Sequence, residues 1–424
     1  MGCSPLIHIQ KERVYIIKVV DSIMGSGKSS AAIQYMNDHK EVNYIYITPY
    51  KDEVERIIEQ TNSTFHQPQI YKKDDETFFK LDSLNSLLAH NKNIATTHAL
   101  FKLANEETRE LLYAGNYVLV LDEVIEVVRQ VNLKEKDMNM LFESKWLLKD
   151  GNKLRWNTYK EEREGEYDGD KFKTIRSYAL NDNLVLHNNK ILLWTLPIDM
   201  FKVFTDAYIL TYMFESSLLK YYFDLHNIDT IKYRATYDKE ESKFIFTPKG
   251  DYTDKHYKEE LKQLIHIYEG DLNKVGDKPF SLSKSWYDDK KHMHKKIKNN
   301  VLNFFQNKAK VKGEYKMWTT FKQFEHKIKG KGYTKGFAPV TIKATNEYQH
   351  KTALAYTVNR FQSPSIRDYF HTNNIDIDED LIAIGELVQW IWRSAIRNDQ
   401  EIKLYIPSSR MRRLLMEWLD DKIK

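Results

Sequence analysis

Ser22-Ile23-Met24-Gly25-Ser26-Gly27-Lys28-Ser29 lies between an apolar run at 14–20, which is typical of a buried strand, and a segment from Ala31 onward that is typical of a helix. A strand, a glycine loop, Lys-Ser and a helix in this order are the context of a phosphate-binding loop. The glycines let backbone N–H groups approach phosphate oxygens, and the helix N-terminus adds partial positive charge there. We therefore expect the Lys28 ammonium to bind the β- and γ-phosphates of ATP and the Ser29 hydroxyl to bind Mg²⁺. The predicted nucleotide-binding residues are Gly25, Ser26, Gly27, Lys28, Ser29 and Ser30.

The first position of this loop departs from the full pattern, which has glycine where this chain has Ser22. A small residue is tolerated there provided that its backbone does not need a positive φ. The alternative interpretation is a glycine turn that binds no ligand, but Lys-Ser in register before a helix argues against it.

A second short aliphatic run, 116–121, ends in the adjacent acids Asp122 and Glu123. In a doubly wound sheet, ligands bind at the carboxyl ends of the strands, so these acids should emerge beside Lys28. Asp122 would hold Mg²⁺ and Glu123 would activate the attacking water. Adjacent carboxylates also occur in ordinary turns, so this prediction depends on their pairing with the phosphate-binding loop.

The composition sets limits on the architecture. The chain has 424 residues, of which 42% are hydrophobic, which is enough for two cores of ordinary size. No apolar run approaches the roughly 20 residues of a membrane span, and no N-terminal signal pattern is present. Cys3 is the single cysteine, which excludes an internal disulfide and a thiolate metal cluster. We expect a protein of the bacterial cytoplasm without membrane contacts.

The charge is nearly balanced, with 65 Lys and Arg against 60 Asp and Glu, but the lysines cluster at 290–298, 308–312 and 327–335. Aromatic residues make up 13% of the chain. Basic segments interleaved with aromatic residues suit a groove that binds single-stranded nucleic acid. The alternative is a solvated basic face.

The first part of the chain alternates strands and helices, which predicts a parallel sheet covered by helices. Turn signals at 145–189 suggest a β-hairpin insertion, after which the apolar run 191–194 resumes the core and 207–213 forms the last strand of the first sheet. We predict an α/β fold with a first lobe at 1–226, an interlobe region at 227–286 and a second lobe at 287–424. The second lobe should contain a helix at 384–397, a strand at 402–406 and a final helix from Ser409.

These segments, in this order, resemble a superfamily 2 helicase of the DEAD/DEAH-like kind, in which two RecA-like P-loop NTPase lobes with parallel sheets clasp ATP between them. The resemblance is closest to short bacteriophage replication helicases and more distant to the herpesvirus-type origin-binding helicases. Residues 22–29 resemble motif I, and Asp122-Glu123 is similar to motif II, although Val124-Ile125 replaces the Ala-Asp or Ala-His of commoner helicases.

The remaining motifs are less specific. Thr48-Pro49 resembles motif Ia, Thr96-Thr97-His98 the next strand-end contact, Trp318-Thr319-Thr320 motif IV and 344–348 motif V. Thr211 resembles motif III, which couples the ATP state to lobe closure, although the usual Ser-Ala-Thr is absent. The resemblance implies nucleic-acid contacts from Thr48, Pro49, Thr96, Thr97, His98, Thr319, Thr320, Lys322 and Asn346.

Residues 389–397 are similar to motif VI, which begins at Gln389. The arginines of that motif usually come four and seven residues after the glutamine, whereas here Arg393 and Arg397 come four and eight after it. Residues four apart share one face of a helix. An arginine that enters the cleft from the opposite lobe stabilises charge in the transition state, and either residue could be this finger; the alternative is an ordinary surface pair. Trp390 and Trp392 are expected to pack in the core.

The resemblance implies an ATP-hydrolysing nucleic-acid translocase or helicase that needs ATP and Mg²⁺ and acts in phage DNA replication. DNA is favoured over RNA as its track, and phage or host replication proteins are possible partners. One alternative is a terminase-like DNA-packaging ATPase, for which the acids at 376–380 would be the nuclease carboxylates. Another is a nucleic-acid-binding scaffold that nucleotide switches without turnover.

Overall fold

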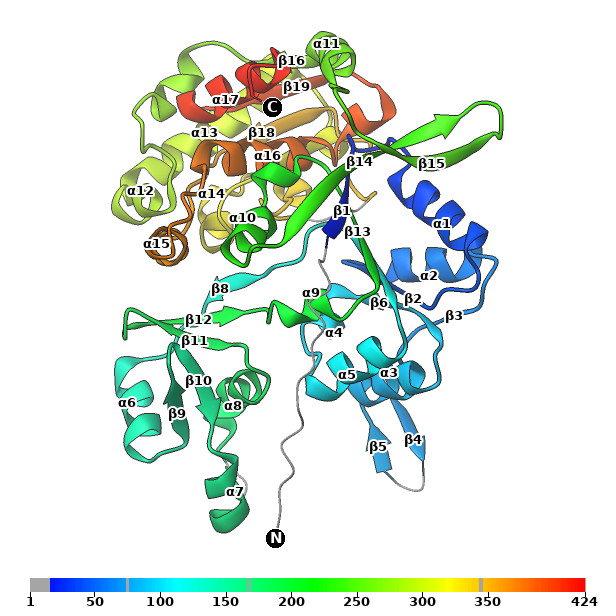
Figure 1. Ribbon diagram of the computed structural model, residues 1–424. Coiled ribbons are helices and arrows are strands. Elements are labelled where there is room, and N and C mark those ends of the chain that lie inside the picture. Colours follow the sequence, from blue (N-terminus) through cyan, green and yellow to red (C-terminus); the bar gives the residue numbers. More distant parts are fainter. Residues whose placement is uncertain (1–15, 74–75, 166, 168, 343–345, 424) are drawn as a thin grey trace.

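The computed structural model describes residues 16–73, 76–165, 167, 169–342 and 346–423. Cys3, the first two residues of the predicted strand at 14–20, and Ala344 and Thr345 of the motif V segment lie outside the described residues. Figure 1 shows two α/β lobes, one blue to green and one light green to red, with a separate inserted sheet at the lower left. Within the described ranges, no helix is both long and apolar enough to span a bilayer.

The first lobe is built on an eight-stranded sheet in the order β15-β14-β1-β13-β7-β2-β6-β3. Every neighbouring pair is parallel except β14 and β15, which form an antiparallel hairpin. Its strands are β1 (Ile16–Asp21), β2 (Tyr44–Thr48), β3 (Phe65–His66), β6 (Asn93–Thr97), β7 (Val118–Asp122), β13 (Asp206–Thr211), β14 (Asp229–Asp238) and β15 (Lys243–Pro248). Its helices are α1 (Lys28–Asp38), α2 (Lys51–Gln60), α3 (Lys80–Ala89), α4 (His98–Phe101), α5 (Glu106–Ala114), α9 (Asp199–Lys202), η2 (Phe214–Ser216) and α10 (Leu218–Leu225), and a small hairpin joins β4 (Tyr71–Lys73) to β5 (Glu76–Phe78).

Both faces of this sheet are buried, as the continuous apolar runs of its strands require. Along β7, Leu119 and Leu121 pack into one core cluster, whereas Val118 and Val120 pack into the cluster on the opposite face. Side chains that alternate between two buried faces explain why the central strands β2 and β7 are largely apolar in sequence.

The insertion is larger than the expected hairpin at 145–189. It is an antiparallel sheet in the order β8-β12-β11-β10-β9 with its own core. Its elements are β8 (Val128–Gln130), α6 (Glu135–Glu143), β9 (Leu147–Asp150), β10 (Lys153–Trp156), α7 (Thr158–Glu164), η1 (Asp170–Phe172), α8 (Lys173–Leu180), β11 (Leu184–His187) and β12 (Ile191–Thr195). The apolar run 191–194 forms β12 of this sheet, and its Leu193 and Trp194 pack into the same core cluster as Leu119 and Leu121 of β7, which confirms that the run resumes the first core. An apolar strand carries no signal that says which sheet it joins.

The second lobe contains a parallel four-stranded sheet in the order β16-β19-β18-β17. Its strands are β16 (Ile265–Ile267), β17 (Lys316–Thr319), β18 (Ala353–Tyr356) and β19 (Ile402–Tyr405). Its α-helices are α11 (Lys255–Leu264), α12 (Lys284–Asp289), α13 (His294–Asn303), α14 (Glu325–Ile328), α15 (Pro364–Thr372), α16 (Glu379–Ile391) and α17 (Ser409–Leu419). Its other helical segments are η3 (Asp271–Gly276), η4 (Lys291–Met293), the π-helical η5 (Phe304–Ala309), η6 (Gly313–Tyr315), η7 (Lys322–Phe324), η8 (Thr334–Gly336) and η9 (Ala395–Asn398).

The expected interlobe region, 227–286, is divided between the two sheets. β14 pairs in parallel with β1, so the hairpin β14–β15 completes the first sheet and projects past α1 in Figure 1. α11 and β16 belong to the second lobe, where β16 pairs with β19. The sequence suggests small strands around 244–246, which β15 confirms, but the polar, lysine-rich pattern of this region gave no sign of the sheet that they join.

The inserted sheet also contacts the second lobe. His187 of β11 is nearly buried, and its Nε2 lies 2.8 Å from the Asp368 carboxylate of α15. Nearby, the Ser365 hydroxyl donates to the Gln130 side chain at 3.0 Å. The insertion therefore bridges the two lobes through α15 (Figure 1).

Candidate functional site

The loop between β1 and α1 encloses the side chain of Lys28. The Lys28 ammonium donates to the carbonyl oxygens of Ser22 at 2.7 Å and of Ile23 at 3.0 Å. Gly25 and Gly27 have φ values of 83° and 84°, a left-handed conformation that glycine adopts without steric cost. The loop thus has the curled backbone that a phosphate-binding loop requires, with its cation held at the centre.

The departure at Ser22 is compatible with this geometry. Ser22 does not have a positive φ, and its side chain is buried. Its backbone N–H donates to Thr211 at 3.1 Å, and its hydroxyl accepts from the Ala235 N–H of β14 at 2.9 Å. A serine at this position therefore fastens the loop to both strands that flank β1.

The acid pair stands at the carboxyl end of β7, as the sequence predicts. Asp122 ends the strand, and Glu123 follows it with a φ of 63°. A left-handed backbone costs a non-glycine residue on the order of 1–2 kcal/mol. The Glu123 N–H donates to Leu210 of β13 at 2.9 Å, which helps to hold this conformation. Strain of this kind is often found at functional sites.

The electrostatics of the pocket favour a bound cation. Burial, the largest cause, and the neighbouring carboxylates Glu123 and Glu53 together raise the pKa of Asp122 to about 7 against the opposing effect of Lys28. Burial also lowers the pKa of Lys28, although Glu123 and Asp122 oppose that shift. Carboxylates crowded in this way are stabilised when a divalent cation joins them. The Asp122 carboxylate and the Ser29 hydroxyl are oxygen donors of the type that suits Mg²⁺.

A pocket of about 740 Å³ lies between the lobes and brings the predicted nucleotide residues together. The first lobe contributes the glycine loop, Lys28, Ser29, Ser30, Asp122 and Glu123, and the second lobe contributes Asn346, Glu347, Trp392, Arg393 and Arg397. Residues that are 223 or more positions apart in sequence therefore line one cavity.

The two arginines reach this pocket by a route that the sequence did not predict. The helix expected at 384–397 is α16, which ends at Ile391, and Arg397 lies in the following 3₁₀ turn, η9. The prediction that Arg393 and Arg397 share one helix face is therefore wrong. The Ser394 side chain accepts from Ile396 N–H at the start of η9, and this local cap competes with continuation of the helix.

Arg393 and Arg397 have different environments. Arg393 is only 4% exposed, and its Nη2 lies 3.9 Å from Glu123 Oε1 across the cleft. Its buried Nε has no hydrogen-bond acceptor among the described residues. Arg397 is exposed and donates to the Asn346 side chain at 2.6 Å. Partial desolvation at the edge of the pocket and the charge of Arg393 both lower the pKa of Arg397. Arg393 is thus the arginine with a donor available to a ligand beside Glu123.

A close helix contact positions Arg393. A Cβ atom at Gly385 of α16 would come within 2.1 Å of the Ser216 hydroxyl in η2 of the first lobe. Glycine at this position lets α16 pack directly on the first lobe, and Arg393 follows two residues after the helix ends. Trp390 near the end of α16 and Trp392 directly after the helix are both buried, which confirms their expected place in the core.

Several lining residues were missed from the sequence. Tyr50, Asp52, Glu53 and Arg56 line the pocket from the start of α2, and Arg56 pairs with Glu53 at 2.5 Å. These residues follow Thr48 and Pro49, so the end of strand β2 could have identified them as residues near the pocket. The ring of Phe244 in β15 lies against Gly27, and no local pattern linked these two positions.

The residues expected to contact nucleic acid are mostly buried. Thr96, His98, Thr319 and Thr320 are at most 5% exposed, and His98 bonds through Nε2 to the Asp122 carbonyl at 2.9 Å. Thr48 and Asn346 line the nucleotide pocket. Pro49 is half-buried, and Thr97 caps α4 through its hydroxyl. Lys322 is exposed and paired with Glu325. Thr211 is buried beside the glycine loop, and Gln389 is half-buried on α16, outside the residues that line the interlobe pocket. Their roles stay predictions.

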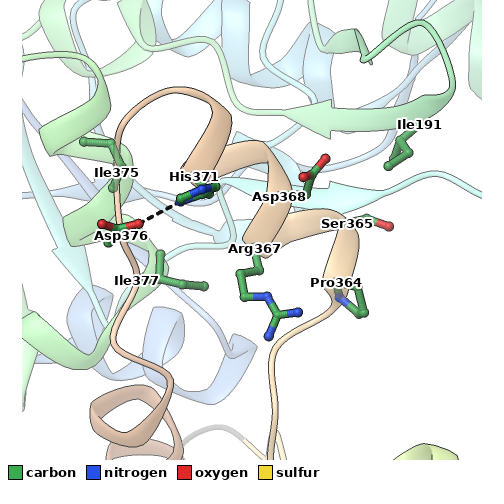
Figure 2. A pocket seen from close by; sticks show the side chains of 9 residues that line it. All are labelled: Ile191, Pro364, Ser365, Arg367, Asp368, His371, Ile375, Asp376 and Ile377. Carbon is green, nitrogen blue, oxygen red and sulfur yellow. Dashed lines mark hydrogen bonds and ion pairs between the residues drawn. The ribbon is translucent and has the colours of Figure 1, made fainter.

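The acids at 376–380 are engaged in structural contacts. Figure 2 shows the Asp376 carboxylate paired with His371, at 2.9 Å, beside a pocket of about 570 Å³. Asp378 caps α16, and Asp380 pairs with Arg410 at 2.6 Å. In the part of the chain that the structure describes, no three His, Cys, Asp or Glu side chains form a group that could hold a metal.

Replacing Gly27 by alanine is expected to destabilise the protein more than replacing Gly25. Both glycines have nearly the same φ, so each substitution adds about 1–2 kcal/mol of left-handed strain. At Gly27 the new Cβ would also lie 2.3 Å from the Phe244 ring, whereas at Gly25 it meets open space. Overpacking of this kind adds about 1–3 kcal/mol. Urea unfolding without nucleotide measures the difference, which Gly27→Ala combined with Phe244→Ala should reduce. Equal effects of the two single substitutions would contradict the prediction.

Comparison with known proteins gives both a fold and a family. The model of the YonV C-terminal Rossmann-like domain matches residues 259–419, and the YonV middle domain matches 128–194, the extent of the inserted sheet. The solved structures described as XPD_Helicase and XPD_APO are each 11% identical to this chain, with a TM-score of 0.51. The matches cover 96% of this chain and 94% and 96% of theirs. This likeness shows that the fold is the two-lobe RecA-like α/β fold of these helicases.

A curated relative matches over nearly its whole length. The SPbeta prophage-derived uncharacterized protein YonV of Bacillus subtilis (strain 168) is 48% identical over 409 residues, which are 96% of this chain and 99% of that protein. Identity at this level over both whole chains means that this chain belongs to the YonV family.

Proposed function

We propose that this protein is a superfamily 2-type ATP-dependent nucleic-acid translocase or helicase that hydrolyses ATP between its lobes. The observation that carries the proposal is the meeting of Lys28, Glu123 and Arg393 in one interlobe pocket. Lys28 and Glu123 come from one lobe and Arg393 from the other, so the site is complete only when the lobes are together.

Each residue has a chemical role in this proposal. Backbone N–H groups around Gly25 and Gly27, together with the Lys28 ammonium, bind the β- and γ-phosphates. Ser29 and Asp122 would hold Mg²⁺, which neutralises phosphate charge when bound. The Glu123 carboxylate orients the attacking water and accepts its proton. Arg393 donates to the oxygen atoms on which negative charge develops in the transition state.

The same geometry couples ATP to movement. Phosphate bound in the cleft attracts Arg393 towards Glu123 and draws the lobes together, and loss of the γ-phosphate removes that attraction. Nucleic-acid contacts on both lobes would then advance stepwise along the strand. Thr211 accepts a hydrogen bond from Ser22 at the base of the loop, which is a suitable place for such coupling.

The track of this motor is proposed to be DNA, and its setting phage DNA replication with phage or host partner proteins. The prophage origin of the relative supports this setting. The structural contacts of the acids at 376–380 do not favour a packaging nuclease.

Steady-state ATP hydrolysis with single-stranded DNA, duplex DNA, RNA or no addition tests the proposal. One nucleic acid is expected to stimulate hydrolysis severalfold, and Lys28→Ala is expected to abolish turnover in every condition because its ammonium binds the transferred phosphate. Turnover that no nucleic acid changes would contradict a motor. ATP binding without turnover would indicate a nucleotide-switched scaffold.

A further inference from the structure

A second polar pocket, of about 660 Å³, lies in the second lobe between α13 and α14. Four lysines line it: Lys291, Lys295 and Lys298 from η4 and α13, and Lys327 from α14. It shares no lining residue with the nucleotide pocket. In Figure 1, α13 and α14 lie on the left of the second lobe and α1 on the right of the molecule. This pocket is therefore a separate feature of the surface.

Within the described residues, the positive charge of this pocket is not neutralised by an ion pair. None of its four lysines forms an ion pair with any residue that the structure describes, whereas the neighbouring Lys322 pairs with Glu325 at 2.6 Å. The Asp288 carboxylate accepts weakly from the Gln323 amide of the pocket lining, at 3.4 Å. An unpaired basic cluster of this kind attracts a polyanion.

The Phe324 ring at the floor of the pocket is held in place by its neighbours, and the four lysines surround it. The Phe324 ring is buried and stacks on Tyr287, with their ring centroids 5.0 Å apart. His294 is held by a contact from its Nε2 to the Tyr287 carbonyl at 2.9 Å. Ile297 and Val301 bury the opposite face of α13. An aromatic floor held in this way and surrounded by lysines suits a ligand that binds across the surface of the pocket.

The spacing of the lysines favours an extended ligand. Lys291, Lys295 and Lys298 follow one another at intervals of four and three residues, which places them along one face of the helical segment. At about 1.5 Å per residue they extend over roughly 10 Å. A single phosphate ion cannot contact charges spread over that length, whereas successive phosphates of a nucleic-acid backbone can.

The position of the pocket in the fold agrees with this ligand. Gln323 and Phe324 belong to η7, which follows the carboxyl end of β17 after a short turn. Ligands of α/β sheets bind at the carboxyl ends of the strands. The Lys322 ammonium lies at the same edge, 5.0 Å from the centre of the Phe337 ring, but its charge is paired with Glu325.

We propose that the pocket of Lys291, Lys295, Lys298 and Lys327 binds the phosphate backbone of the nucleic-acid strand. This inference rests on the proposed function, because it names the place where the second lobe holds the track. Lysines supply compact charges that bind phosphates without reading sequence, so the contact would be independent of base identity.

The test compares two triple variants of the full chain. The pocket variant is Lys291→Ala, Lys295→Ala and Lys298→Ala. The control, Lys308→Ala, Lys312→Ala and Lys331→Ala, removes the same charge from exposed lysines of the same lobe outside the pocket. Fluorescence anisotropy with a labelled oligothymidylate measures affinity over a series of KCl concentrations. The pocket variant is expected to lose tenfold or more in affinity, and its slope of log K against log salt should shrink by about 2, at about 0.7 for each lost phosphate contact.

The outcomes separate this inference from the proposed function. Hydrolysis of ATP without nucleic acid should be unchanged in both variants, since none of the six lysines lines the nucleotide pocket. Equal affinity and slope in the two variants would overturn the inference and leave the motor intact. Loss of binding in the pocket variant alone, with no stimulation of wild-type hydrolysis, would support the inference and contradict the motor. Wild-type protein that binds no oligonucleotide would also overturn the inference. Polyglutamate serves as a second probe, and a pocket variant that loses polyglutamate binding but keeps oligonucleotide binding would overturn the inference and assign the pocket to an acidic protein.

Discussion

Replacing Arg393 by alanine is expected to lower kcat for ATP hydrolysis by about 10³–10⁵, the contribution of an arginine that stabilises charge in phosphoryl transfer. Arg397→Ala is expected to cost far less. Arg393 is buried, lies 3.9 Å from Glu123 and keeps an unbonded Nε, whereas Arg397 is exposed and bonded to Asn346. The measurement is kcat at saturating ATP and nucleic acid for the two variants side by side.

Two controls make this comparison specific. Binding of a fluorescent ATP analogue should change little in Arg393→Ala, because the phosphates are held mainly from the first lobe. Arg393→Lys should recover only part of kcat, since an ammonium lacks the guanidinium's rigid set of donors. A larger loss in Arg397→Ala than in Arg393→Ala would reverse the assignment and make Arg397 the finger.

Replacing Glu123 by glutamine is expected to lower kcat by about 10²–10⁴ while ATP still binds, as for the loss of a general base. Glutamine has the size of glutamate, so the strained turn at φ 63° and the N–H bond to Leu210 should survive. Single-turnover hydrolysis measures the chemical step, and thermal unfolding checks that the fold is retained.

Asp122→Asn is the matched control for this substitution. It removes the adjacent carboxylate, so it should raise the Mg²⁺ concentration needed for half-maximal hydrolysis. Glu123→Gln should leave that Mg²⁺ requirement nearly unchanged. Normal turnover by Glu123→Gln would remove Glu123 from the role of base.

The local chemistry of the first lobe was accessible from the sequence. Gly25, Gly27 and Lys28 stand within a few residues of each other, and the apolar run before Asp122 marks a strand end. Parallel strands place their carboxyl ends at one edge, so local patterns sufficed to bring Lys28 and Asp122 together. The alternation of strands and helices predicted the parallel sheet for the same reason.

Sequence patterns were less informative where an element packs far from its neighbours in the chain. The sheets that the strand β12 and the hairpin β14–β15 join were not predicted, because an apolar or amphipathic strand does not encode its pairing partner. The end of α16 at Ile391 was missed, because the cap at Ser394 competes with an otherwise helical pattern.

By itself, the sequence determined a glycine loop around Lys28, an acid pair and an α/β fold, since each depends on residues close together in the chain. Only the tertiary structure selected Arg393 over Arg397, because burial and the 3.9 Å approach to Glu123 arise from the packing of α16 on the first lobe. Only the tertiary structure placed Phe244 against Gly27 and gathered four unpaired lysines around one pocket. Such contacts depend on how separate elements pack in space, and the spacing of residues along the chain does not encode that packing.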